Sequence, residues 1–70
     1  MKISARNQLA GTVSAIHEGA VNGIVVIDLD GGATVTADIT MGSIKALGLE
    51  PGKPCAAVIK ATEVMVGVEE

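Results

Sequence analysis

Hydrogen-bond donors gather at three places along a chain that has few other reactive side chains. Ser4 and Arg6, the only arginine, lie in the N-terminal stretch KISARNQL. Thr40 and Ser43 have the spacing T-x-x-S, which brings both hydroxyls to the first turn of an expected helix. Lys60 lies on the polar face of an expected strand, just before a bend. Taken singly, each of these residues is also explained as a surface charge or a helix cap.

Together these donors fit one kind of ligand, a fully ionised tetrahedral oxyanion. Such an anion offers only hydrogen-bond acceptors, so a site made only of donors satisfies it completely. A protonated oxyanion would leave an O–H group facing other donors, which costs about 1–3 kcal/mol in a buried site. Free N–H groups at the start of a helix add to the attraction. The sequence therefore favours dianions that stay unprotonated at neutral pH.

No group of residues forms a catalytic or metal-binding pattern. His17, the only histidine, stands in a turn beside Glu18, without a second residue placed for acid–base chemistry. Three aspartates, at Asp28, Asp30 and Asp38, have a spacing that matches no calcium loop. We therefore expect a binding protein rather than an enzyme, without direct ligands for a metal cation.

The length and composition predict one small domain, spanning residues 1–70, that is stabilised by self-association. A chain of 70 residues buries a smaller fraction of its surface than a larger domain does, so a single folded copy would be only marginally stable. The lone Cys55 excludes an intramolecular disulfide and suits a reducing compartment. Nearly half of the residues are apolar, yet none is aromatic, so each buried side chain contributes little area. Association between chains is the remaining common remedy.

The acidic charge and the short apolar runs each argue against one class of partner. Nucleic-acid binding needs clustered lysine and arginine or aromatic stacking platforms, and the chain has neither. The N-terminus lacks the apolar run of a signal peptide, and no stretch approaches the ~20 apolar residues of a membrane span. We expect a cytoplasmic protein without nucleic-acid or membrane partners.

The hydrophobic pattern predicts an all-β fold with one short helix. Apolar and polar residues alternate with the period of a strand, and Leu9, Gly11, Val13 and Ala15 are expected on one face. Thr40 is a suitable N-cap for a helix that ends before Gly48. The order β-β-β-α-β-β is that of a five-stranded OB-like barrel. The expected strands cover residues 9–17, 21–30, 33–40, 55–61 and 63–68, with a bend near Thr62.

Three stretches, in the same order and spacing, give the chain a resemblance to a known family. KISARNQL, the T-x-x-S before IKALGLEPG, and KATEVMVGVE resemble the molbindins, the small Mop-type molybdate-binding proteins. The resemblance implies an OB-like fold and a cytoplasmic homohexamer, built as a trimer of dimers. It also implies storage and homeostasis of molybdate, with tungstate as a surrogate ligand. The alternative is an oligomerisation or regulatory module that binds an anion incidentally.

The resemblance further implies where the oxyanion binds, namely at interfaces between subunits. Asn22, in the turn HEGAVNG, is the best candidate for a second anion site near a threefold axis. For the main site, one chain would supply Ser4, Ala5, Arg6, Asn7, Lys60, Ala61 and Thr62, and the neighbouring chain Thr40 and Ser43.

Overall fold

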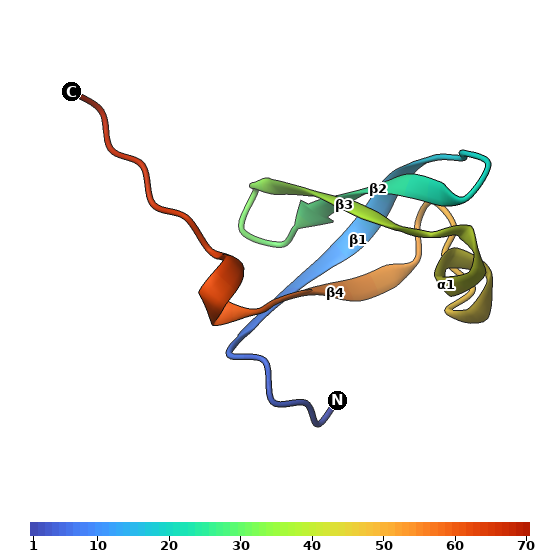
Figure 1. Ribbon diagram of the computed structural model, residues 1–70, viewed down its shortest axis with the longest axis horizontal. Helices are drawn as coiled ribbons and strands as arrows, with labels where there is room; N and C mark the ends of the chain where they lie inside the picture. Colours follow the sequence, from blue (N-terminus) through green and yellow to red (C-terminus); the bar gives the residue numbers. More distant parts are fainter.

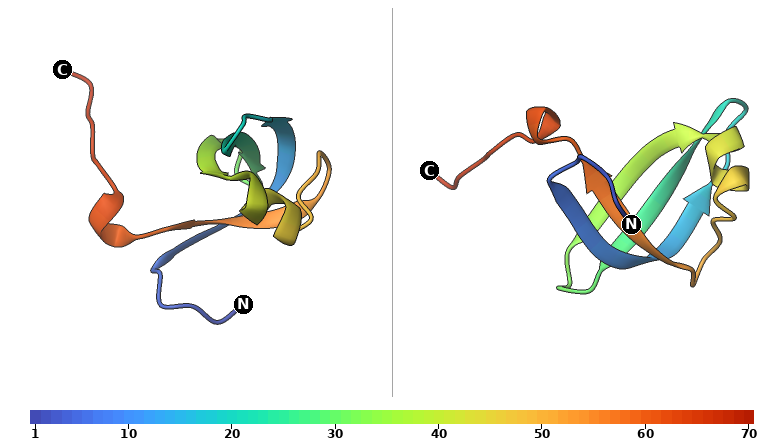
Figure 2. Two further views of the ribbon diagram at one scale, coloured as in Figure 1. Left: turned by 45° about the vertical axis from the view of Figure 1, so that its right-hand side comes forward. Right: turned by 90° about the horizontal axis from the view of Figure 1, so that it is seen from below.

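The computed structural model describes all 70 residues and contains a single antiparallel sheet. Its four strands lie in the order β3-β2-β1-β4, so β3 and β4 are the two edges. The sheet curls into a half-barrel, and the short helix lies at one of its ends (Figures 1 and 2). The elements are β1 (Asn7–His17), β2 (Asn22–Leu29), β3 (Thr34–Thr40), α1 (Met41–Ala46), β4 (Pro54–Ile59) and the 3₁₀ turn η1 (Ala61–Glu63).

The all-β fold with one helix is confirmed, but the strand expected over residues 63–68 is wrong for the isolated chain. The fourth strand ends at Ile59, η1 replaces the expected bend, and residues 64–70 extend away from the sheet (Figure 1). We call residues 64–70 the C-terminal arm. An extended segment becomes a strand only when a neighbouring backbone accepts its hydrogen bonds, and no strand of the same chain lies beside the arm.

The expected alternation along β1 is interrupted by a bulge at Ser14. The register with β2 shifts between Val13 and Ala15, so that Ile16 lies opposite Val25 and Ala15 lies opposite Val26. Ile16 therefore packs against the core in place of Ala15. A bulge of this kind increases the local twist of a strand, which helps the sheet to curl.

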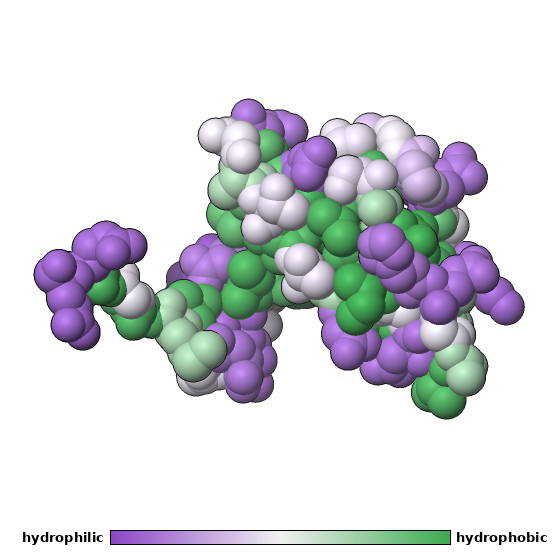
Figure 3. All heavy atoms as spheres, turned by 90° about the horizontal axis from the view of Figure 1, so that it is seen from above, coloured by the Kyte–Doolittle hydropathy of each residue, from purple (hydrophilic) through white to green (hydrophobic).

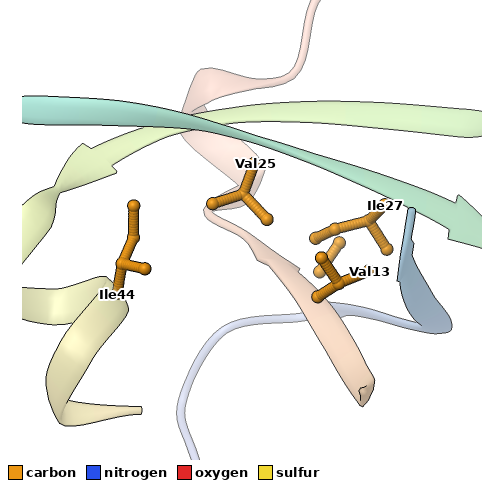
Figure 4. Packing of buried hydrophobic residues seen from close by; sticks show 5 residues of the cluster. Val13, Val25, Ile27 and Ile44 are labelled. Atoms are coloured by element: carbon orange, nitrogen blue, oxygen red, sulfur yellow. The ribbon is translucent and has the colours of Figure 1, made fainter. Parts of the chain in front are cut away.

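The core consists of five small aliphatic side chains, drawn from the inner face of the sheet and from the helix (Figure 4). They are Val13, Val25, Ile27, Ile44 and Ala57. Only 7 of the 70 residues are buried, so much of the apolar surface stays exposed in a single chain. No helix in the structure has the length and hydropathy needed to cross a membrane.

The end of α1 has the hydrogen bonds of a Schellman motif. The N–H of Gly48 donates to the carbonyl of Lys45 at 3.1 Å, and that of Leu49 donates to the carbonyl of Ile44 at 3.0 Å. Gly48 has a φ of 62°, which lies in the left-handed region that favours glycine. Lys53 Nζ then donates to the carbonyl of Leu47 at 2.7 Å. This end of the helix is therefore fixed without a ligand.

We expect Gly48→Ala to lower the free energy of unfolding by about 1–2 kcal/mol, because alanine resists a positive φ. Chemical denaturation measures the change. Gly31→Ala is the matched control, since Gly31 has no positive φ and no atom within 4 Å of a built Cβ. An equal loss of stability in both variants would contradict this account of the helix end.

Candidate anion-binding site

A pocket of about 560 Å³ lies between the N-terminal segment and the end of β4. Figure 1 shows these two segments, together with η1, at the end of the sheet opposite to α1. The fold therefore brings together two of the donor groups expected from the sequence, although more than fifty residues separate them along the chain. The lining residues are Ile3, Ser4, Ala5, Arg6, Val58, Lys60, Ala61 and Thr62.

The pocket offers positive charge without a carboxylate. Arg6 and Lys60 both line it, and no aspartate or glutamate does. Neither cationic side chain makes a hydrogen bond to another residue of the chain. Both are therefore free to bind an anion with charge-assisted hydrogen bonds.

Main-chain N–H groups add further donors. Those of Arg6, Lys60, Ala61 and Thr62 have no acceptor in the chain. The two hydrogen bonds of η1 use other groups: Glu63 N–H donates to the carbonyl of Lys60 at 2.9 Å, and Val64 N–H to that of Ala61 at 3.3 Å. Unpaired N–H groups at the start of a turn attract anions.

Thr40 and Ser43 form the start of α1, as expected, but they lie far from this pocket. Thr40 pairs with Asn22, the first residue of β2, at the end of the sheet where β1 finishes. The pocket lies at the other end, next to Asn7, the first residue of β1. The two groups are thus at opposite ends of the sheet (Figure 1). One chain does not bring Thr40 and Ser43 to Arg6 and Lys60.

The hydrogen bonds at the start of α1 leave fewer donors free than the sequence suggests. Ser43 N–H donates to Thr40 Oγ1 at 3.0 Å, and Met41 N–H donates to the carbonyl of Val21 at 2.8 Å. Thr40 Oγ1 also lies 2.8 Å from Ser43 Oγ and donates to it. The Ser43 hydroxyl and the Gly42 N–H are the donors that remain available at this position.

The remaining candidate residues lie outside both groups. Asn7 does not line the pocket; its Nδ2 donates to the carbonyl of Ile59 at 3.3 Å. Asn22 Nδ2 donates to Asp38 Oδ1 at 3.0 Å on the exposed face, and the second anion site there stays a prediction. His17 and Cys55 join no cluster of three or more residues that could hold a metal ion.

Sequence reasoning missed Ile3, Val58 and Gln8. The first two line the pocket with apolar atoms. Gln8 lies opposite Val58 in the β1–β4 pair, and its Nε2 donates to the carbonyl of Ala5 at 3.0 Å. The position of Gln8 directly after the SARN stretch was the only signal in the sequence.

A curled OB-like sheet with a donor-lined pocket defines a small module that binds anionic ligands. Residues 3–66 match the model of the TOBE domain. The chain belongs to the TOBE domain family and, within it, to the Mop-type proteins that the sequence resembles.

Three related proteins illustrate the similarity. A probable molybdenum-pterin-binding protein of Haemophilus influenzae is 55% identical over 99% of this chain and 100% of its own length. The structure of a molybdate-binding protein from Sporomusa ovata has a TM-score of 0.90 and 43% identity, covering 97% of this chain and 100% of the other. ModG, a cytoplasmic molybdate-binding protein solved with molybdate bound, has a TM-score of 0.92 and 46% identity, covering 99% of this chain and 49% of the other.

Proposed function

We propose that the protein binds molybdate, or tungstate in its place, for storage and homeostasis in the cytoplasm, and that it is not an enzyme. The observation that carries the proposal is a pocket lined by Arg6, Lys60 and unpaired main-chain N–H groups, without a carboxylate. The relatives support it, since their names describe binding of molybdate or of molybdenum-pterin.

The donor chemistry explains the choice of anion. Molybdate is a dianion without a proton at neutral pH, so all of its oxygens accept hydrogen bonds. Phosphate keeps at least one O–H under the same conditions, and that group would face only donors in this pocket. We therefore expect molybdate to bind more tightly than phosphate.

We propose that a second copy of the chain completes the site. The pocket of about 560 Å³ has the size of a drug-sized ligand site, and one five-atom anion would fill only a small part of it. The Ser43 hydroxyl and Gly42 N–H of a neighbouring chain would add donors on the open side. In the proposed homohexamer, a trimer of dimers, every chain supplies both halves of a site.

The exposed arm supports self-association. Val66 and Val68 of the arm are 90% and 87% exposed, an unusual state for valine. A groove of about 500 Å³ lies between β3 and β4, which are the unpaired edges of the sheet. We call it the edge groove. Figure 3 shows apolar atoms at the surface of the sheet and along the arm, which ends in hydrophilic residues. The residues lining the edge groove are Ile27, Val35, Thr36, Ala37, Ile39, Leu47, Ala56, Ala57, Val58 and Ile59.

We propose that the arm of one chain lies in the edge groove of another. There it would pair with the free edges of β3 and β4 and close the half-barrel as its fifth strand. Both partners would lose exposed apolar surface, which favours association by about 25 cal/mol for each Å² buried. This arrangement restores the predicted OB-like barrel through a strand from a second chain.

The test is isothermal calorimetry of the purified protein with molybdate, sulfate and phosphate, combined with native mass spectrometry. We expect tight molybdate binding by an oligomer and weaker binding of phosphate. An oligomer that takes up no molybdate would contradict the proposal and favour an oligomerisation module. Equal affinity for phosphate would contradict the donor-only account of selectivity.

A further inference from the structure

The first two residues of β1 use their amide side chains to hold backbone carbonyls beside the pocket. Asn7 Nδ2 donates to the carbonyl of Ile59 at 3.3 Å. Gln8 Nε2 donates to the carbonyl of Ala5 at 3.0 Å. Neither Asn7 nor Gln8 lines the pocket itself. Each side chain therefore acts on the pocket only through the peptide that it holds.

The two carbonyls belong to peptide units that the pocket uses. The Ala5 carbonyl shares its peptide plane with the N–H of Arg6, and the Ile59 carbonyl shares its plane with the N–H of Lys60. Both peptide bonds are trans, so the C=O and N–H of each unit point in opposite directions. Fixing the carbonyl therefore fixes the direction of the N–H group. Both N–H groups have no acceptor in the chain.

We infer that Asn7 and Gln8 are positioning residues for the anion, and that they orient the main-chain N–H groups of Lys60 and Arg6. The inference rests on the proposed function and deepens it, because it assigns Arg6 a role through its backbone as well as its side chain. Asn7 is thereby placed behind the site rather than in contact with the ligand.

The hydrogen bond from Gln8 matters because the N-terminal segment has few other bonds to hold it in place. Residues 1–6 belong to no strand, and the backbone of Ser4, Ala5 and Arg6 takes part in no backbone hydrogen bond. The Gln8 side chain is the one group that donates a hydrogen bond to this segment. A segment ordered before binding loses less conformational freedom when the ligand arrives, so preorganisation raises affinity.

The test compares Gln8→Met, which keeps the length of the side chain but removes the donor, with Asn7→Leu and Ser14→Ala. Ser14 is the matched control: its Oγ donates to the carbonyl of Val26 at 3.2 Å, a side-chain-to-backbone bond of the same kind away from the pocket. Calorimetry gives the molybdate affinity, thermal unfolding gives the stability, and amide NMR follows the N–H resonances of Arg6 and Lys60.

In the wild-type protein, molybdate is expected to shift both N–H resonances. Gln8→Met should weaken binding by about tenfold, the size of effect that supporting residues have at metal sites. It should also abolish the shift of Arg6 while that of Lys60 remains. Asn7→Leu should abolish the shift of Lys60 while that of Arg6 remains. Ser14→Ala should match the wild type. Because Gln8 is exposed, Gln8→Met is expected to fold and to decide the question even if Asn7→Leu does not fold.

Four results would overturn the inference, and they differ in what they reject. Wild-type protein without molybdate binding would reject the proposed function and the inference with it. Wild-type binding together with unchanged affinity in Gln8→Met would reject the positioning role alone. A loss of affinity with both resonance shifts intact, or an equal loss in Ser14→Ala, would show a general structural effect instead of orientation of one N–H group.

Discussion

Lys60→Met is expected to raise the dissociation constant for molybdate by between about tenfold and 100-fold. The variant removes a charge-assisted hydrogen bond, and such a bond contributes about 1.5–3 kcal/mol, where 1.4 kcal/mol equals a factor of ten. Methionine keeps the apolar stem, and the Lys60 side chain makes no hydrogen bond within the chain, so the fold should be unchanged. Calorimetry at constant ionic strength measures the effect.

Lys45→Met is the matched control, because it removes the same charge from an exposed position on α1. A similar loss of affinity in both variants would indicate a long-range effect of net charge and would contradict the site.

The same variant also tests whether a site is shared between chains. Lys60→Met and Ser43→Ala each damage every site when prepared alone. If the two variants are unfolded, mixed in equal amounts and refolded together, about one quarter of the shared sites regain both intact halves by random assembly. A mixture without such recovery would contradict a site shared between two chains.

Val66→Asp is expected to dissociate the oligomer and to lower the stability of the chain. Val66 is 90% exposed in one chain, and the proposal places it in an apolar groove of another. Burying an unpaired carboxylate in such a groove costs several kcal/mol. Analytical ultracentrifugation at matched protein concentrations measures the change in mass.

Met65→Asp is the control for this second prediction. Successive side chains of a strand point to opposite faces, so Met65 would lie on the other side of the arm from Val66. We expect a weaker effect on association. If both variants keep the wild-type mass, the arm does not hold the oligomer together.

Local patterns predicted most of the elements correctly. The Thr40 cap and the Gly48 end depend on a few adjacent residues, and the structure confirms both. The bulge at Ser14 could not be predicted in this way. Its cause is the register between β1 and β2, and a single unpaired residue leaves no clear mark on the alternation of apolar side chains.

The pairing of the arm and the supporting role of Gln8 escaped prediction for different reasons. Residues 64–68 have the composition of a strand, but whether they pair depends on a neighbouring backbone that the chain does not supply. The donors of the pocket were recognised by type, whereas the supporting role of Gln8 follows from a hydrogen bond to Ala5 that only coordinates reveal. Side chains that act through another group carry little signal in one sequence.

The pocket residues Ser4, Ala5 and Arg6 lie at the opposite end of the sheet from Ser43. This separation has a consequence for how much molybdate a cell could hold. In the proposed shared site, an isolated chain holds only one half of the donors, so capacity depends on the amount of protein as well as on the amount of anion. Dilution below the threshold for assembly would empty the store even with ligand present. Near this threshold, doubling the number of chains would then more than double the number of complete molybdate sites.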